Sequence, residues 1–168
     1  MSDRLLLNTH EVNIILNRLA CQLRESHLDF SNTVLIGLQP RGVLLSQRLC
    51  VILAEEYGIE NLQMGFLDIT FFRDDFRRSE KVLKASSTQL EFSIENKTVV
   101  LVDDVLFTGR SIRAALNAIE SFARPKAVKS LILIDRRFSR ELPIQPDYCG
   151  LQVDSRLNEK VIVNWKEI

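Results

Sequence analysis

Residues 99–111 read V-V-L-V-D-D-V-L-F-T-G-R-S, and this stretch is the strongest indication of the fold in the sequence. It begins as an apolar, β-branched run, which is typical of a strand buried on both faces of a sheet. Two carboxylates, Asp103 and Asp104, stand where this strand is expected to end. Thr108-Gly109-Arg110-Ser111 then opens a segment with helical apolar spacing. The stretch therefore predicts a strand, an acidic pair, a small-residue turn and a helix, in that order.

This order of elements suits the binding of a sugar phosphate. The free N–H groups and the positive dipole end of a helix favour an anion. A carboxylate pair a few residues away can accept hydrogen bonds from sugar hydroxyls and help to order a hydrated divalent cation. A plain capped helix beside two solvated carboxylates is an alternative that stays open.

Two other uses of paired aspartates at a strand end fit less well. A response-regulator receiver carries its acidic pair near the start of its domain, whereas Asp104 lies past the middle of this 168-residue chain. A Walker-type nucleotide site needs G-x-x-x-x-G-K-[ST] before the acidic pair, and the sequence has none there.

The composition is that of an ordinary globular protein, and its length predicts a single domain over residues 1–168. The 22 basic and 22 acidic residues cancel, so no global field draws the chain to nucleic acid or membrane. The three cysteines form no C-x-x-C pair and no signal peptide is recognisable, which favours reduced thiols and a cytoplasmic location. No apolar run reaches transmembrane length, so we expect no membrane partner.

Strand and helix patterns alternate along the chain. Strands alternating with helices imply right-handed βαβ units and an α/β fold, a mostly parallel central sheet flanked by helices. Residues 73–88 are polar and without periodicity, which predicts a long mobile loop. Helices are expected at residues 9–24, with Thr9 as the cap, at 42–57 and at 111–122. Strands are expected at residues 33–38, 64–72, 128–134, 148–153 and 160–165, and a further strand is expected to begin at Val99.

Ligands of parallel sheets gather at the carboxyl ends of the strands. This rule places residues 38–42, 71–76, 103–111 and 135–140 on one rim. In the first of these segments, Arg41 can clamp phosphate oxygens and Gly42 lets the backbone approach a ligand. Such a short motif is also common in ordinary strand-to-helix turns, so both interpretations stay open for it.

Residues 99–111 strongly resemble the ribose-phosphate motif of type I phosphoribosyltransferases. The resemblance implies their fold, with a small hood and a mobile lid loop, and implies Asp103, Asp104 and Arg41 as catalytic residues. Mg²⁺ would ride on oxygens of phosphoribosyl diphosphate (PRPP) near the acidic pair, with no direct protein cage. The implied PRPP site comprises Gln39, Pro40, Arg41 and Gly42 around the pyrophosphate, Asp103 and Asp104 at the ribose, Thr108, Gly109, Arg110 and Ser111 around the 5-phosphate, and the intervening Val105, Leu106 and Phe107.

Further runs narrow the resemblance to the PyrR family of pyrimidine operon attenuation proteins, which are also uracil phosphoribosyltransferases. Residues 67–76, L-D-I-T-F-F-R-D-D-F, resemble its D-I-T-L-Y-R-D-D-L run, and residues 135–144 resemble its D-R-G-x-R-E-L-P-I run. Residues 155–163 resemble its closing segment. The resemblance implies formation of uridine monophosphate (UMP) from uracil and PRPP, UMP and UTP as ligands, and an mRNA leader bound by a homodimer.

The residue types at two positions bear on the base. Phe107 stands where hypoxanthine-guanine enzymes carry an Asp, and its ring can pack under a small base but cannot act as an acid or base. This argues against 6-oxopurines but leaves adenine and orotate open. For uracil, the resemblance points to Arg136 and to the backbone near Val153. Cations between residues 71 and 88 would form the lid, namely Arg73, Arg77 and Arg78.

The chain departs from the family pattern at positions linked to RNA. The family's L-T-R-I-A-H reads Leu16-Asn17-Arg18-Leu19-Ala20-Cys21 here, and a thiol cannot replace the His contact. The run 136–140 holds an extra residue where the family has a shorter, Gly-containing turn. The candidate RNA contacts are Arg18, Arg24, Arg137 and Arg140, which a two-fold dimer could gather on one surface.

Pro40 replaces the family's Thr and offers no N–H to the pyrophosphate. A weakly catalytic sensor of PRPP is therefore an alternative. A transferase for another base is a further one, because Phe107 leaves adenine and orotate open.

Overall fold

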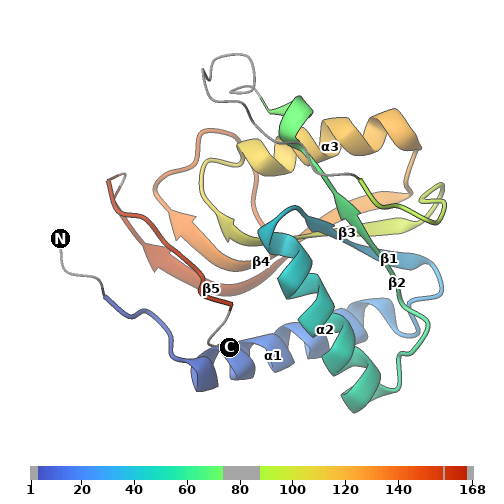
Figure 1. Ribbon diagram of the computed structural model, residues 1–168, viewed down its shortest axis with the longest axis horizontal. Helices are drawn as coiled ribbons and strands as arrows, with labels where there is room; N and C mark the ends of the chain where they lie inside the picture. The colour runs from blue at the N-terminus through green and yellow to red at the C-terminus, as the bar shows by residue number, and fades with distance from the viewer. Residues whose placement is uncertain (1–3, 74–87, 157, 166–168) are drawn as a thin grey trace.

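The computed structural model describes residues 4–73, 88–156 and 158–165 (Figure 1). Its centre is one five-stranded sheet in the order β2-β1-β3-β4-β5, and every neighbouring pair of strands is parallel. The predicted parallel sheet is therefore confirmed. The strands are β1 (Thr33–Leu38), β2 (Gln63–Leu67), β3 (Thr98–Leu106), β4 (Ala127–Arg137) and β5 (Tyr148–Asp154).

Helices cover both faces of the sheet (Figure 1). On one face lie α1 (Thr9–His27) and α2 (Arg41–Tyr57), which contact each other. On the other lies α3 (Arg110–Phe122), with the short 3₁₀ turn η1 (Thr70–Phe72) beside it. None of the helices in the described ranges is long and apolar enough to cross a membrane.

β3 runs through the middle of the sheet and separates two apolar cores. Val100 and Val102 pack with α1 and α2, whereas Val99 and Leu101 pack with α3. This alternation is the two-residue period of a strand buried on both faces. Its continuation puts Asp104 on the same side as Val102, where α2 begins.

Three expectations about the elements are wrong in detail. Helix α1 is capped by Asn8, not Thr9, because Asn8 and Glu11 exchange reciprocal hydrogen bonds in a capping box. Strand β2 ends at Leu67, because the Asp68 carboxylate accepts the Thr70 N–H at 2.8 Å and turns the chain. Residues 160–165 form no strand; Val161, Val163 and Trp165 pack against the α1–α2 core without pairing to the sheet.

Candidate active site

A cavity of about 610 Å³ opens at the carboxyl edge of the sheet. The ends of β1 and β3, the starts of α2 and α3, and the turn after β5 line this cavity. The structure thus brings together at one rim most side chains that the sequence placed there. Those predicted residues are Gln39, Pro40, Arg41, Arg73, Asp103, Asp104, Val105, Phe107, Ser111 and Arg136.

The acidic pair forms the floor of the cavity. Asp104 is only 4% exposed, and its Oδ2 atom is buried without a hydrogen-bond partner in the structure. Burial is the main cause that raises the pKa of Asp103 and of Asp104 above the usual range of a carboxyl group. The Asp104 charge raises the pKa of Asp103 further, whereas the Arg41 guanidinium, 3.8 Å from Asp104, counteracts the rise at Asp104. Perturbed carboxyls in a cleft are typical of functional sites.

The turn between β1 and α2 brings Arg41 to the pair. Gly42 is needed here for a different reason from the one the sequence suggested: a Cβ at this position would lie 2.1 Å from the Val102 carbonyl oxygen. The missing side chain therefore lets α2 start directly against β3, which sets Arg41 beside Asp104. The Gln39–Pro40 peptide bond is cis, and the Gln39 N–H donates to the Leu67 carbonyl at 3.0 Å.

The turn between β3 and α3 is built on Gly109. Its φ of 92° lies in the left-handed region that glycine adopts without strain. Ser111 lines the cavity, and α3 presents its N-terminal turn there with no side-chain cap at Gly109. The Arg110 side chain instead forms an ion pair with Glu141 at 2.6 Å, and Leu106 is buried in the α3 core.

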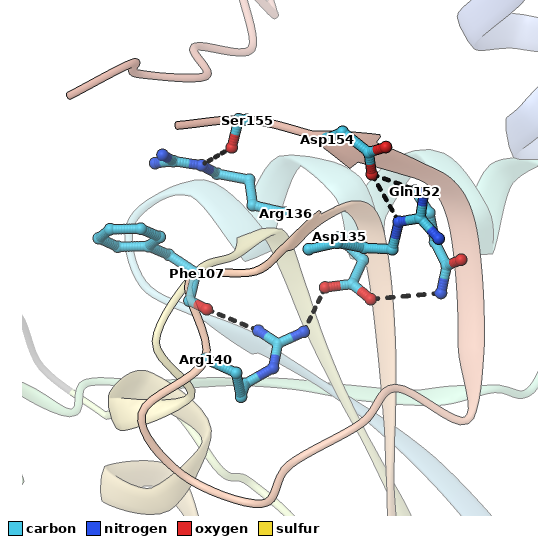
Figure 2. Close-up of polar contacts among 8 residues, drawn as sticks. Phe107, Asp135, Arg136, Arg140, Gln152, Asp154 and Ser155 are labelled. Carbon is cyan, nitrogen blue, oxygen red and sulfur yellow. Dashed lines mark hydrogen bonds and ion pairs between the residues drawn. The ribbon is translucent and has the colours of Figure 1, made fainter. Parts of the chain in front are cut away.

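The far side of the cavity is formed by a stacked pair, Phe107 and Arg136 (Figure 2). The Arg136 guanidinium lies 4.0 Å from the centre of the Phe107 ring and is only 5% exposed as a residue. It donates to the Ser155 hydroxyl at 2.8 Å and to the carbonyls of Arg156 and Glu159 at 3.0 and 2.7 Å. Burial lowers the pKa of Arg136, and the nearby Glu159 counteracts this effect.

Through these bonds Arg136 holds the turn after β5 against the cavity. Residues 158–161 of this turn line the cavity, although no functional role was predicted for them. The resemblance of residues 155–163 to the closing segment of the family was the available signal. Val153 pairs in register with Arg136, but its side chain packs toward the α1–α2 core and does not line the cavity.

The predicted lid is only partly described. Arg73 lines the cavity, whereas Arg77 and Arg78 lie outside the described residues. At the two ends of the undescribed stretch, Phe66 forms an isolated antiparallel bridge with Gln89, and the Asp68 N–H donates to the Thr88 hydroxyl at 3.2 Å.

The four arginines proposed for RNA do not share one environment. Arg18 donates to the carbonyls of Cys149 and Gly150 on β5, and Arg24 is half-buried at the end of α1. Arg137 pairs with Asp154 at 2.6 Å on the surface. Arg140 points inward, where it donates to the Phe107 carbonyl and to Asp135, so its guanidinium is not presented on the surface as expected.

The fold and this rim define a phosphoribosyltransferase: the Phosphoribosyl transferase domain family matches residues 4–164, and the chain belongs to it. Within this class its relatives are PyrR proteins. "Bifunctional protein PyrR" of Desulfosudis oleivorans is 44% identical over 94% of this chain and 86% of the relative. The PyrR protein of Chloroflexus aurantiacus is 40% identical over 99% of this chain and 90% of its own length.

Solved structures agree on the fold. A hypoxanthine phosphoribosyltransferase from Staphylococcus aureus superposes with a TM-score of 0.70 at 19% identity, over 92% of this chain and 80% of that one. The hypoxanthine phosphoribosyltransferase of Trypanosoma cruzi superposes with a TM-score of 0.71 at 19% identity, over 90% of this chain and 82% of that one. At this identity the likeness establishes the type I fold and leaves the base open.

Proposed function

We propose that this protein transfers the phosphoribosyl group of PRPP to uracil, giving UMP and pyrophosphate, and that it also binds a pyrimidine leader RNA as a regulator. The observation that carries the transferase proposal is the buried carboxylate pair between Arg41 and the start of α3. It supplies negative charge beside donors for two anionic groups, the arrangement that a sugar carrying phosphate at one end and diphosphate at the other needs.

The 5-phosphate would lie at the N-terminus of α3. The first turn of a helix has N–H groups without intrahelical acceptors, and its dipole favours an anion. Ser111 lines the cavity at this turn and adds a hydroxyl donor. The backbone of Thr108 and Gly109 completes the loop.

The ribose would lie over the acidic pair. The Asp104 Oδ2 atom, which has no hydrogen-bond partner among the described residues, can accept a hydrogen bond from a ribose hydroxyl. As the bond between the anomeric carbon and pyrophosphate breaks, the sugar gains positive charge, and Asp103 and Asp104 stabilise that charge from fixed positions. Arg41 lies where it can stabilise the departing diphosphate.

The residues of this site suit a Mg²⁺ ion that is bound mainly through the oxygens of PRPP. In the described ranges no group of three or more His, Cys, Asp or Glu side chains could hold a metal by itself. The orphaned Asp104 oxygen and the raised pKa of both carboxyls mark a place that favours a cation. When bound, Mg²⁺ supplies charge neutralisation for the diphosphate, with Asp103 and Asp104 nearby to orient it.

Uracil would bind between the ribose and the Phe107–Arg136 stack. The Arg136 Nε and Nη2 atoms are used by the turn after β5, and no hydrogen bond of Nη1 is found within the described ranges. A guanidinium N–H can donate to a uracil carbonyl, and the backbone near Val153 and along residues 158–161 can pair with the base edge.

The experiment for the transferase is a base panel of uracil, hypoxanthine, adenine and orotate with PRPP and Mg²⁺. We expect UMP formation, and a loss of at least ~100-fold in kcat for Asp104→Asn because charge stabilisation at the sugar is removed. Asp154→Asn, which changes an exposed carboxylate outside the cavity, is the control. Turnover of another base alone would contradict the proposal.

A PRPP sensor with weak catalysis is the second candidate, and one observation favours it. The Gln39 N–H is used by Leu67, and Pro40 has none, so the pyrophosphate loop has fewer backbone donors. Tight PRPP binding by calorimetry without turnover of any base would establish the sensor and reject the transferase.

The regulatory activity rests on PyrR family membership and on surface groups. Arg18, Arg24 and Arg137 are the proposed contacts, and in a homodimer they could combine on one face. The exposed Phe138 lies 5.3 Å from the Arg137 guanidinium and could stack on an unpaired base. A filter-binding titration against the organism's own pyrimidine leader should show enhancement by UMP or UTP and a steep salt dependence. Equal binding of scrambled RNA would reject it.

A further inference from the structure

We infer that Arg140 is a positioning residue of the 5-phosphate loop, and that the segment 140–142 holds this loop with its N–H groups directed at the ligand. This inference rests on the proposed transferase function, because it concerns the same anion site. It also gives Arg140 a different role from the RNA contact that the sequence suggested.

Arg140 links the turn after β3 to the neighbouring strand β4, close to where their pairing ends at Leu106 and Asp135 (Figure 2). Its Nη1 donates to the Phe107 carbonyl at 2.7 Å, at the end of β3, and its Nη2 donates to the Asp135 carboxylate on β4. Asp135 is 4% exposed and also accepts from the Gln152 amide at 3.5 Å. The buried Asp135 carboxylate thus fixes the guanidinium through Nη2. The Nη1 atom, held in place in this way, fixes the orientation of the Phe107 carbonyl.

The next two residues continue the same contact. The N–H groups of Glu141 and Leu142 both donate to the Thr108 carbonyl, at 3.0 and 3.2 Å. Leu142 and Ile144 lie against Gly109, where an added Cβ would be 3.4 Å from them, at ordinary van der Waals distance. Two successive loop carbonyls, those of Phe107 and Thr108, therefore point at residues 140–142.

The direction of these carbonyls sets the direction of the donors. In a trans peptide the C=O and the following N–H point in opposite directions. Only the Gln39–Pro40 peptide is cis in the described ranges, so the Phe107–Thr108 and Thr108–Gly109 peptides are trans. With both carbonyls held by residues 140–142, the N–H groups of Thr108 and Gly109 point away from that segment, toward the side where a phosphate at α3 would lie.

The side chain must be arginine for this task. A guanidinium has several N–H donors in a rigid plane and can bond to a carboxylate and a carbonyl at once. A lysine ammonium keeps the charge but is a point donor on a flexible stem. Loss of the Arg140 bond would leave the Phe107 peptide free to rotate, and the Thr108 N–H would lose its direction.

The test compares Arg140→Lys and Arg140→Met with Arg124→Met, an exposed arginine beyond α3 and outside the cavity. Both Arg140 variants should raise the KM for PRPP by ~10-fold or more, while the KM for uracil changes much less. Arg124→Met should match the original protein. A fall in folded fraction lowers apparent kcat but leaves KM unchanged, so destabilisation alone cannot give the expected result.

Two results would overturn the inference. An unchanged KM for PRPP with reduced kcat would make Arg140 a purely structural residue. An unchanged KM for PRPP with lost leader-RNA binding would make it an RNA contact. The dissociation constant of Mg²⁺–PRPP from calorimetry, measured on the same variants, keeps the test independent of turnover. If the original protein makes no UMP but Arg140→Lys still weakens PRPP binding, the transferase proposal fails and the positioning role stands.

Discussion

The Asp104 carboxylate and the Arg41 guanidinium face each other across 3.8 Å at the floor of the cavity, and the Asp104 Oδ2 atom has no hydrogen bond to any residue that the structure describes. The pair is therefore close enough for electrostatic attraction but leaves a buried oxygen unsatisfied. Such an atom is costly in a native structure unless something else binds it. The energetic cost is consistent with a site built for a ligand that carries hydroxyls and a cation.

The acidic pair makes a contribution to stability without ligand that we expect to fall as pH rises. Burial raises the folded pKa of Asp103 and Asp104, so between the ordinary value of about 3.9 and the raised values the native state binds more protons than the unfolded chain. In urea unfolding from about pH 4 upward, the midpoint of the original protein should fall relative to that of Asp103→Asn, so the two proteins should differ in slope. A slope that Asp103→Asn leaves unchanged would contradict this assignment.

Gly42→Ala should destabilise the protein strongly, because the new Cβ would meet the Val102 carbonyl oxygen at 2.1 Å. Overpacking against backbone forces α2 away from β3 and costs roughly 1–3 kcal/mol or more. The same shift moves Arg41 from Asp104, so PRPP binding should weaken as well. Gly58→Ala is the matched control, since its Cβ would meet nothing within 4 Å and only its φ of +65° carries a penalty. Urea unfolding and calorimetry measure the two effects, and equal costs at both glycines would contradict the close-packing argument.

Phe138→Gly should stabilise the protein. Phe138 has a φ of 66° and is 79% exposed, so it occupies a left-handed conformation without burying its ring. That conformation costs a residue with a side chain about 1–2 kcal/mol, which exceeds the ~0.5–1 kcal/mol of an exposed contact with Arg137. Phe122→Gly, at the end of α3, should have the opposite sign. Destabilisation by Phe138→Gly in chemical unfolding would show that the exposed ring contributes more than we infer.

The environment of His27 should make one contribution to stability that is lost in acid. Its ring lies 2.9 Å from the Tyr148 hydroxyl and 3.1 Å from the Thr33 hydroxyl, and burial, followed by the nearby Lys129 charge, lowers its pKa. The unfolded chain then binds more protons near its usual value of about 6.5, so this contribution is present above that pH and is lost as pH falls toward the folded pKa. His27→Gln should remove this component of the pH profile, whereas His10→Gln, exposed at the start of α1, should not. An unchanged profile in His27→Gln would reject the assignment.

Local sequence patterns are enough to predict the sheet class and the place of the cavity at the edge of the sheet. β1 and the end of α2 at Tyr57 fall where periodicity and Gly58 placed them, and the β3–α3 turn lies at Thr108–Gly109. These features depend on residues close in the chain, such as apolar spacing, a glycine at a turn and two adjacent acids. The rule that ligands bind at the carboxyl ends of parallel strands then predicts that Arg41, Asp103 and Asp104 lie together, and all three line one cavity.

The partner of each polar side chain depends instead on contacts between segments that are far apart in the chain. Arg140 was expected on the surface, yet it bonds inward to the Phe107 carbonyl, 33 residues away in the chain. Arg136 was assigned to the base, and three of its bonds hold the turn after β5. Long arginine side chains can reach several partners, and which one is available depends on segments that meet only after the parallel strands align. The local sequence around an arginine does not show which distant segment will lie beside it. Periodicity along the chain therefore predicts where the cavity lies, whereas packing between the strands sets the roles of its arginines.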